Sequence, residues 1–110
     1  MKNVTVIVSE APGSRTAEKL RMSVGLTLED GNAVTVLLID DGVYAALGLD
    51  REKTGVDIDK HLKMLEMMKK AVIAHKPSME ARGIANARFG IKEITDGELG
   101  KILAETDAVL

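Results

Sequence analysis

Short runs of aliphatic residues near the start of the chain predict two buried strands. Residues 4–8 (Val-Thr-Val-Ile-Val) and 33–39 (Ala-Val-Thr-Val-Leu-Leu-Ile) are not interrupted by charged side chains, which is typical of strands covered on both faces. Between them, apolar residues recur at helical spacing over residues 17–29 and predict a helix. A strand, a helix and a strand with short connections predict a right-handed βαβ unit with parallel strands.

The alternation continues along the chain. Residues 43–47 predict one helical turn, residues 57–70 a helix, and residues 71–74 a third strand. The next three residues, His-Lys-Pro, predict a loop, after which Ser78 suits the N-cap of a brief helix that ends at Gly83.

The end of the chain completes the fold prediction. Residues 84–93 are ambiguous and are compatible with an irregular loop that contains a short strand. Residues 95–98 (Thr-Asp-Gly-Glu) have the capping-box pattern ahead of a helix through Glu105, and residues 107–110 predict a last short strand. The chain is therefore predicted to be one α/β domain over residues 1–110. We expect three layers (α/β/α) around a mostly parallel sheet of about five strands.

Composition excludes several classes of function. The chain has 110 residues, of which 45% are hydrophobic and 29% charged, as in an ordinary globular domain. Aromatic residues make up only 2%, which argues against the stacking platforms of single-strand nucleic-acid readers. Cysteine is absent, so the chain can form no disulfide, thiolate zinc site, iron–sulfur cluster or persulfide.

The formal charge of −2 is too neutral for a general nucleic-acid binder. The basic residues nevertheless concentrate in residues 63–92, which hold seven Lys or Arg and two acidic residues. This segment is either a solvated face or a local surface that attracts anions. No segment resembles a signal peptide or a membrane span, so we expect a cytoplasmic protein without a membrane partner.

Three segments are expected to meet where ligands bind in parallel sheets, at the carboxyl ends of the strands near a change in strand order. They are residues 9–15, 40–43 and 75–82. Gly13 and Ser14 lie between a strand and a helix, where backbone N–H groups could hold an anion, although a tight turn alone explains the glycine.

The other two segments carry titratable side chains. Asp40 and Asp41 precede Gly42 and could bind a cation or act as acid and base, but neighbouring residues at a strand end point apart, and one could simply cap the next turn. His75 could be a general base or a metal ligand together with Asp40, Asp41 or Glu10, or an ordinary loop histidine.

The helix predicted over residues 57–70 has an unusually wide apolar face. On a helical wheel its apolar residues cover an arc of about 220°, whereas one buried stripe needs little more than ~100°. Methionine is common at adaptable contacts, and Met64, Met67 and Met68 lie on this face. We expect homo-oligomerisation through this helix, with deep insertion between the sheet and a loop as the alternative. His61, near the centre of the face, would then be an interface or core histidine.

Several segments, in order, resemble one known family. They are the opening strand and loop, the helix ending in residues 28–32 (Leu-Glu-Asp-Gly-Asn), the strand that leads into residues 41–43 (Asp-Gly-Val), residues 78–84 (Ser-Met-Glu-Ala-Arg-Gly-Ile), and the closing helix and strand. Together they resemble the DsrE/DsrF-like family of small sulfur-relay proteins over nearly the whole chain, and residues 78–84 look like its Ser-x-x-Ala-Arg-Gly segment.

The resemblance implies a flavodoxin-like α/β/α fold, a cytoplasmic location and assembly into trimers or hexamers. In sulfur-carrying members a cysteine in the loop after the third strand accepts persulfide sulfur, and counting back from Ser78 places that position on His75, within one residue. Because the chain has no cysteine, the sulfur-transfer role does not carry over.

The chain is therefore predicted to be a non-catalytic, cysteine-less member that binds a small anionic or sulfur-containing ligand or serves as an accessory subunit, with no cofactor and no metal. Two alternatives stay open: a structural partner in a hetero-oligomer of related sulfur-relay subunits, and an enzyme that uses His75 as general base. The expected ligand-binding residues are Gly13, Ser14, Asp41, Gly42, His75, Lys76, Ser78 and Arg82.

Overall fold

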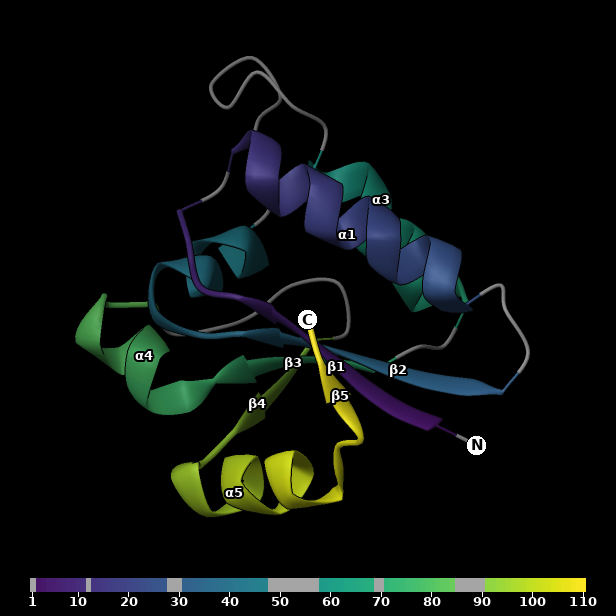
Figure 1. Ribbon diagram of the computed structural model, residues 1–110. Coiled ribbons are helices and arrows are strands. Elements are labelled where there is room, and N and C mark those ends of the chain that lie inside the picture. Colours follow the sequence, from purple (N-terminus) through teal and green to yellow (C-terminus); the bar gives the residue numbers. More distant parts are fainter. Residues whose placement is uncertain (1, 12, 28–30, 48–57, 69–70, 85–90) are drawn as a thin grey trace.

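The computed structural model describes residues 2–11, 13–27, 31–47, 58–68, 71–84 and 91–110. Within these ranges a five-stranded parallel sheet forms the centre of the molecule, with the strand order β4-β3-β2-β1-β5 (Figure 1). The strands are β1 (Lys2–Val8), β2 (Asn32–Leu38), β3 (Ala71–His75), β4 (Lys92–Ile94) and β5 (Ala108–Val109). The predicted α/β class and the parallel sheet are confirmed.

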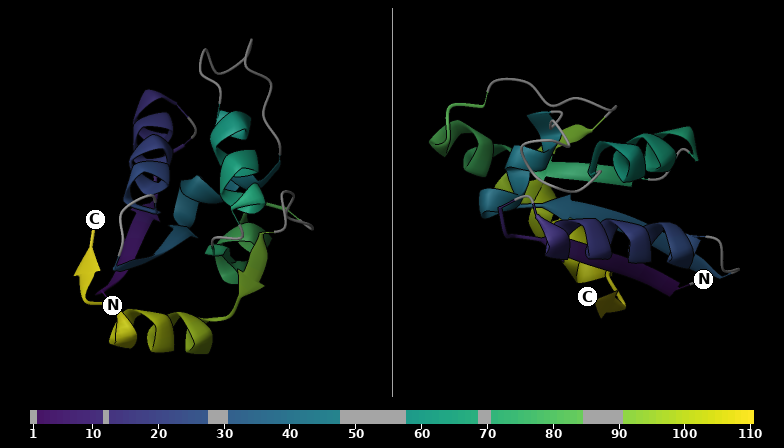
Figure 2. Two further views of the ribbon diagram at one scale, coloured as in Figure 1. Left: turned by 90° about the vertical axis from the view of Figure 1, so that its right-hand side faces the viewer. Right: turned by 90° about the horizontal axis from the view of Figure 1, so that it is seen from above.

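Helices cover both faces of the sheet, as Figures 1 and 2 show. α1 (Ser14–Thr27) and α3 (Ile58–Met67) lie side by side on one face, and α5 (Asp96–Glu105) lies on the other. The 3-10 helix η1 (Asp40–Leu47) and the short helix α4 (Lys76–Ala81) follow β2 and β3 at the carboxyl ends of those strands. No described helix has the length and apolar character of a membrane span.

The two faces of the sheet are packed very differently. The face under α1 and α3 carries the main core, in which Val8, Leu20, Val36, Leu62 and Leu65 are all buried. The opposite face has a small cluster of Leu37, Ile73 and Ile94, and no residue of α5 is fully buried. Since hydrophobic stabilisation follows the apolar area buried, most of it comes from the α1–α3 face, and the α5 face is only partly covered.

Local sequence rules explain most element boundaries. Thr95 is the N-cap of α5 and forms the predicted capping box with Glu98. α4 ends before Gly83, whose φ of +69° is in the left-handed region that glycine adopts without strain. η1 begins at Asp40, three residues earlier than the predicted turn. Three predicted stretches lie outside the described residues: the end of the first helix (28–29), both ends of the helix predicted over residues 57–70 (57 and 69–70), and residues 85–90.

The predicted loop at residues 75–77 is wrong. β3 continues through His75, and α4 begins directly at Lys76, so the strand passes into the helix without a connecting loop. Pro77 is compatible with this because the first turn of a helix does not use the proline N–H. His75, not Ser78, occupies the N-cap position, and Ser78 lies buried within the helix.

Candidate functional site

His75, the last residue of β3, lies at the centre of a hydrogen-bonded cluster. Its side chain is largely buried, and the residue is 9% exposed. Its Nδ1 lies 2.7 Å from the Ser78 hydroxyl, one turn along α4, and its Nε2 lies 2.6 Å from a carboxylate oxygen of Asp96 at the start of α5. The cluster therefore joins β3, α4 and α5 through one imidazole ring.

The direction of these hydrogen bonds follows from the groups involved. An ionised carboxylate only accepts, so the bond to Asp96 requires a hydrogen on His75 Nε2. In a neutral imidazole Nδ1 then accepts, and the Ser78 hydroxyl donates to it. The Ser78 oxygen accepts in turn from the backbone N–H of Asp40, at 3.0 Å. All four groups are satisfied when the ring is neutral and carries its hydrogen on Nε2.

Asp40 and Asp41 have different roles at the end of β2. Asp40 adopts a φ of +52°, a conformation that asparagine and aspartate reach more readily than other residues with a Cβ, and its N–H faces Ser78. The Asp41 carboxylate accepts from Arg82 Nε at 3.0 Å, while Arg82 Nη1 donates to the backbone carbonyl of Ser78 at 3.1 Å. Asp41 thus contacts Arg82 through its carboxylate, whereas Asp40 contacts Ser78 through its backbone N–H.

Gly42 packs directly against the backbone at the end of β1. A Cβ at this position would lie 1.8 Å from the carbonyl oxygen of Val8 at the end of β1. Only glycine therefore fits here, which gives a structural reason for the residue independent of any ligand.

Six of the eight predicted site residues fall into two groups. Asp41, Ser78, Arg82 and His75 are linked by the hydrogen bonds described above. Gly13 and Ser14 lie at the start of α1, and no hydrogen bond among the described residues joins them to the His75 cluster. The chain adds β2, β3 and β4 on one side of β1 and then returns to place β5 on the other side, so the change in strand order lies between β1 and β5. The His75 cluster lies at β2 and β3, away from this point.

Lys76 is the exposed basic residue of this edge. It follows His75 directly and has neither an ion pair nor a side-chain hydrogen bond within the described part of the chain. The Arg82 guanidinium is more enclosed, with its side chain 23% exposed and paired with Asp41. Lys76 is therefore the cation best placed to meet a ligand from solvent.

The sequence analysis missed Asp96. β4 pairs with β3 in a register that sets Ile94 beside His75, so Asp96, two residues later, comes within reach of the ring. The capping box did place Asp96 in the first turn of a helix. The missing information was the position of β4 at the sheet edge next to β3, because residues 84–93 gave no clear strand pattern.

The arrangement restricts the chemistry of the imidazole. Both ring nitrogens are engaged by protein groups, so a metal or a ligand could reach His75 only by displacing Ser78 or the exposed Asp96 carboxylate. Among the described residues no group of three or more His, Asp or Glu side chains is arranged to hold a metal ion. The cluster is a satisfied polar network whose rim carries both basic residues (Lys76 and Arg82) and exposed carboxylates (Asp41 and Asp96).

The whole chain matches one family. The model of the DsrE/DsrF-like family covers residues 2–110. The chain belongs to the DsrE/DsrF-like family. It is also similar to the ychN protein from E. coli, whose crystal structure superimposes with a TM-score of 0.87 at 26% sequence identity, over 100% of this chain and 98% of that one. No curated protein matches the sequence. The flavodoxin-like α/β fold and a relation to sulfur-relay proteins are thereby established for this DsrE/DsrF-like chain.

Proposed function

We propose that this DsrE/DsrF-like chain is a non-catalytic, oligomeric cytoplasmic protein that binds a small anionic or sulfur-containing ligand, or a partner subunit, at the carboxyl edge of β2 and β3. The observation that carries the proposal is the identity and the surroundings of residue 75. Counted from the Ser-x-x-Ala-Arg-Gly segment, this position lies within one residue of the cysteine of sulfur-carrying members, and here it is a buried histidine.

Persulfide carriage requires a thiolate, and the chain has no cysteine at any position. The imidazole that replaces the thiol does not present a free nitrogen, since Ser78 and Asp96 occupy both. This chain keeps the fold of its sulfur-relay relatives but lacks their reactive thiol. It is therefore best suited to bind a ligand or to assemble with other subunits. The exposed Lys76 and the partly enclosed Arg82 favour an anion at this edge.

Substitution of Lys76 tests whether an anion binds at this edge. Sulfate, sulfite, thiosulfate and phosphate are titrated at constant ionic strength, with the melting temperature as readout. At least one of them is expected to stabilise the wild type, and Lys76→Gln is expected to weaken that binding by about three-fold, as for a partly screened charge.

Lys63→Gln, an equally exposed lysine on α3, is the matched control and should leave binding unchanged. No stabilisation by any of the four anions would contradict the anion site and would favour the role of a purely structural subunit. Equal weakening by both variants would show only a general charge effect.

The cluster of Ser78, His75 and Asp96 favours one second candidate, an enzyme in which His75 acts as general base toward the Ser78 hydroxyl. Ser78 is 6% exposed and already accepts from Asp40 N–H, so it is poorly placed to attack a substrate. Covalent labelling by a fluorophosphonate probe that disappears in Ser78→Ala would replace the accessory role with this one. The remaining alternative, a structural partner, predicts a stable complex with a cysteine-bearing relative.

The exposed methionines of α3 support the proposal that the protein forms oligomers. Leu62 and Leu65 of α3 are buried in the core, while Met64 and Met67 are 39% and 83% exposed and His61 is half-buried. Large apolar side chains of α3 therefore extend beyond its buried face. Such side chains on a monomer are typical of a contact surface.

Sedimentation velocity tests this contact. The wild type is expected to sediment as a trimer or hexamer, and Met67→Lys is expected to shift it toward smaller species, because it places a charge in the proposed interface. Leu103→Lys, at a 39% exposed position on α5 across the sheet, is the control and should not change the assembly. A monomeric wild type at micromolar concentration would refute the interface.

A further inference from the structure

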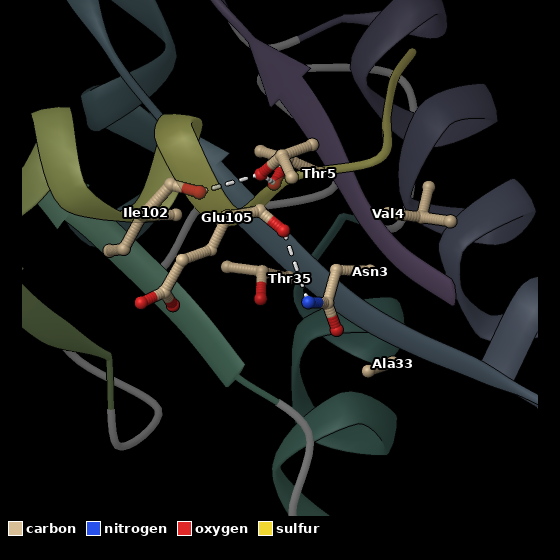
Figure 3. A pocket seen from close by; sticks show the side chains of 8 residues that line it. Asn3, Val4, Thr5, Ala33, Thr35, Ile102 and Glu105 are labelled. Atoms are coloured by element: carbon tan, nitrogen blue, oxygen red, sulfur yellow. Dashed lines mark hydrogen bonds between the residues drawn. The ribbon is translucent and has the colours of Figure 1, made fainter. Parts of the chain in front are cut away.

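A hollow lies on the α5 face of the sheet, toward the amino ends of β1 and β2 and away from His75. Its volume is about 160 Å³, and Figure 3 shows it between two strands and the end of α5. Asn3 and Thr5 line it from β1, Thr35 from β2, Ile102 and Glu105 from the last turn of α5, and Thr106 from the C-cap of that helix. The partial cover of this face leaves the hollow open.

The hydrogen bonds around the hollow use the hydroxyl hydrogens of Thr5 and Thr106 and one of the two side-chain amide hydrogens of Asn3. The Thr106 hydroxyl donates to the carbonyl oxygen of Ile102 at 2.7 Å. Thr106 has one hydroxyl hydrogen, so the 2.7 Å contact between the Thr5 and Thr106 hydroxyls must be a bond that Thr5 donates. The side-chain amide of Asn3 donates to the carbonyl oxygen of Glu105 at 3.1 Å (Figure 3).

The acceptors of the same groups stay open. The Thr5 oxygen keeps a free lone pair, Asn3 Oδ1 has no partner among the described residues, and the Glu105 carboxylate has neither an ion pair nor a hydrogen bond there. The Thr35 hydroxyl also lacks a partner in the described part of the chain and can act in either direction. The carboxyl end of α5 adds the negative end of its helix dipole.

We propose that this hollow binds a small organic cation through an ammonium or guanidinium group. Such a group brings only donors, which suits a site whose open acceptors outnumber its free donors, one Asn3 amide hydrogen and the Thr35 hydroxyl. Its charge also matches Glu105 and the carboxyl end of α5. A divalent metal fits less well, because Glu105 is the only ionised side chain among the lining residues. The site is separate from the His75 edge and does not depend on the function proposed there.

Amide NMR spectra of the ¹⁵N-labelled protein test the proposal directly. Propane-1,3-diamine is titrated against propane-1,3-diol at equal pH and ionic strength. The diamine is expected to shift the Asn3 side-chain amide and the Thr35 and Thr106 resonances along a saturating millimolar curve, whereas the diol leaves them in place.

Two variants distinguish binding in the hollow from a general effect of the protein's charge. Glu105→Gln keeps the shape and removes the charge, and Thr35→Val removes only the hydroxyl; each is expected to raise the dissociation constant by about three-fold. Glu66→Gln, an exposed acid on α3 across the sheet, should have no effect. Equal shifts with the diol, equal weakening by Glu66→Gln, or no saturating response to the diamine would overturn the proposal.

The same cation could be a free amine or a lysine or arginine side chain of a second copy. Sedimentation velocity with and without saturating diamine distinguishes them. An unchanged assembly assigns the site to a free amine, and dissociation by the diamine assigns it to a side chain of the second copy; both outcomes support recognition of a cation.

Discussion

Replacement of Gly42 by alanine is expected to lower the free energy of unfolding by about 3 kcal/mol. The new Cβ would lie 1.8 Å from the carbonyl oxygen and 2.6 Å from the carbonyl carbon of Val8. Both are backbone atoms, so no rotamer change can relieve the overlap.

The contact lies within a tightly bonded turn. Ile39 N–H donates to the Val8 carbonyl at 3.0 Å, and Gly42 N–H donates to the Ile39 carbonyl at 2.9 Å. To admit a methyl group, η1 must move away from the end of β1, and these hydrogen bonds would lengthen. The displacement would also reach Asp41 and its ion pair with Arg82.

Urea unfolding measures the effect, with the slope of the transition as a check that the denatured state is unchanged. Gly25→Ala in α1 and Gly100→Ala in α5 are matched controls, since a Cβ at either position meets no atom within 4 Å. Both should raise the free energy of unfolding by about 0.5–1 kcal/mol, the usual gain from glycine to alanine within a helix. A Gly42→Ala protein as stable as the wild type would contradict the close approach of η1 to β1.

The strands were predictable because their signal is local. The aliphatic runs within β1 and β2 carry no charged side chain over residues 4–8 and 33–38, a pattern typical of strands covered on both faces. The capping box at Thr95 is equally local, because both of its hydrogen bonds lie within four residues. The position of the main core was therefore predictable from these segments, and the family resemblance implied the same α/β fold.

The site was predictable only in part, because its contacts are between segments distant in sequence. Sequence analysis brought His75, Ser78, Asp41 and Arg82 to one edge. It interpreted Pro77 as part of a loop, whereas Pro77 lies in the first turn of α4, and this helix places Ser78 next to the His75 ring. The partnership of His75 with Asp96, 21 residues away, depends on the register of β3 and β4, which no local pattern specifies.

Replacement of His75 by alanine is expected to lower the free energy of unfolding by about 3 kcal/mol. The substitution empties a buried position at the end of β3 and removes the acceptor of the Ser78 hydroxyl. The bond to Asp96 contributes the smaller share, because that carboxylate is 79% exposed and water replaces the lost partner. Asp96→Asn is accordingly expected to cost less than about 1 kcal/mol.

A double-mutant cycle between His75 and Ser78 isolates the interaction that links β3 to α4. Ser78→Ala alone should cost about 1–2 kcal/mol, since it leaves the Asp40 N–H without its acceptor. The double variant is expected to lose about 1 kcal/mol less than the two single losses together, because their shared bond is lost only once. Lys76→Ala, at the exposed neighbouring position, is the control and should remain within about 0.5 kcal/mol of the wild type. Strict additivity would show that His75 and Ser78 act separately, and His75 would then be free to serve a ligand instead of the fold.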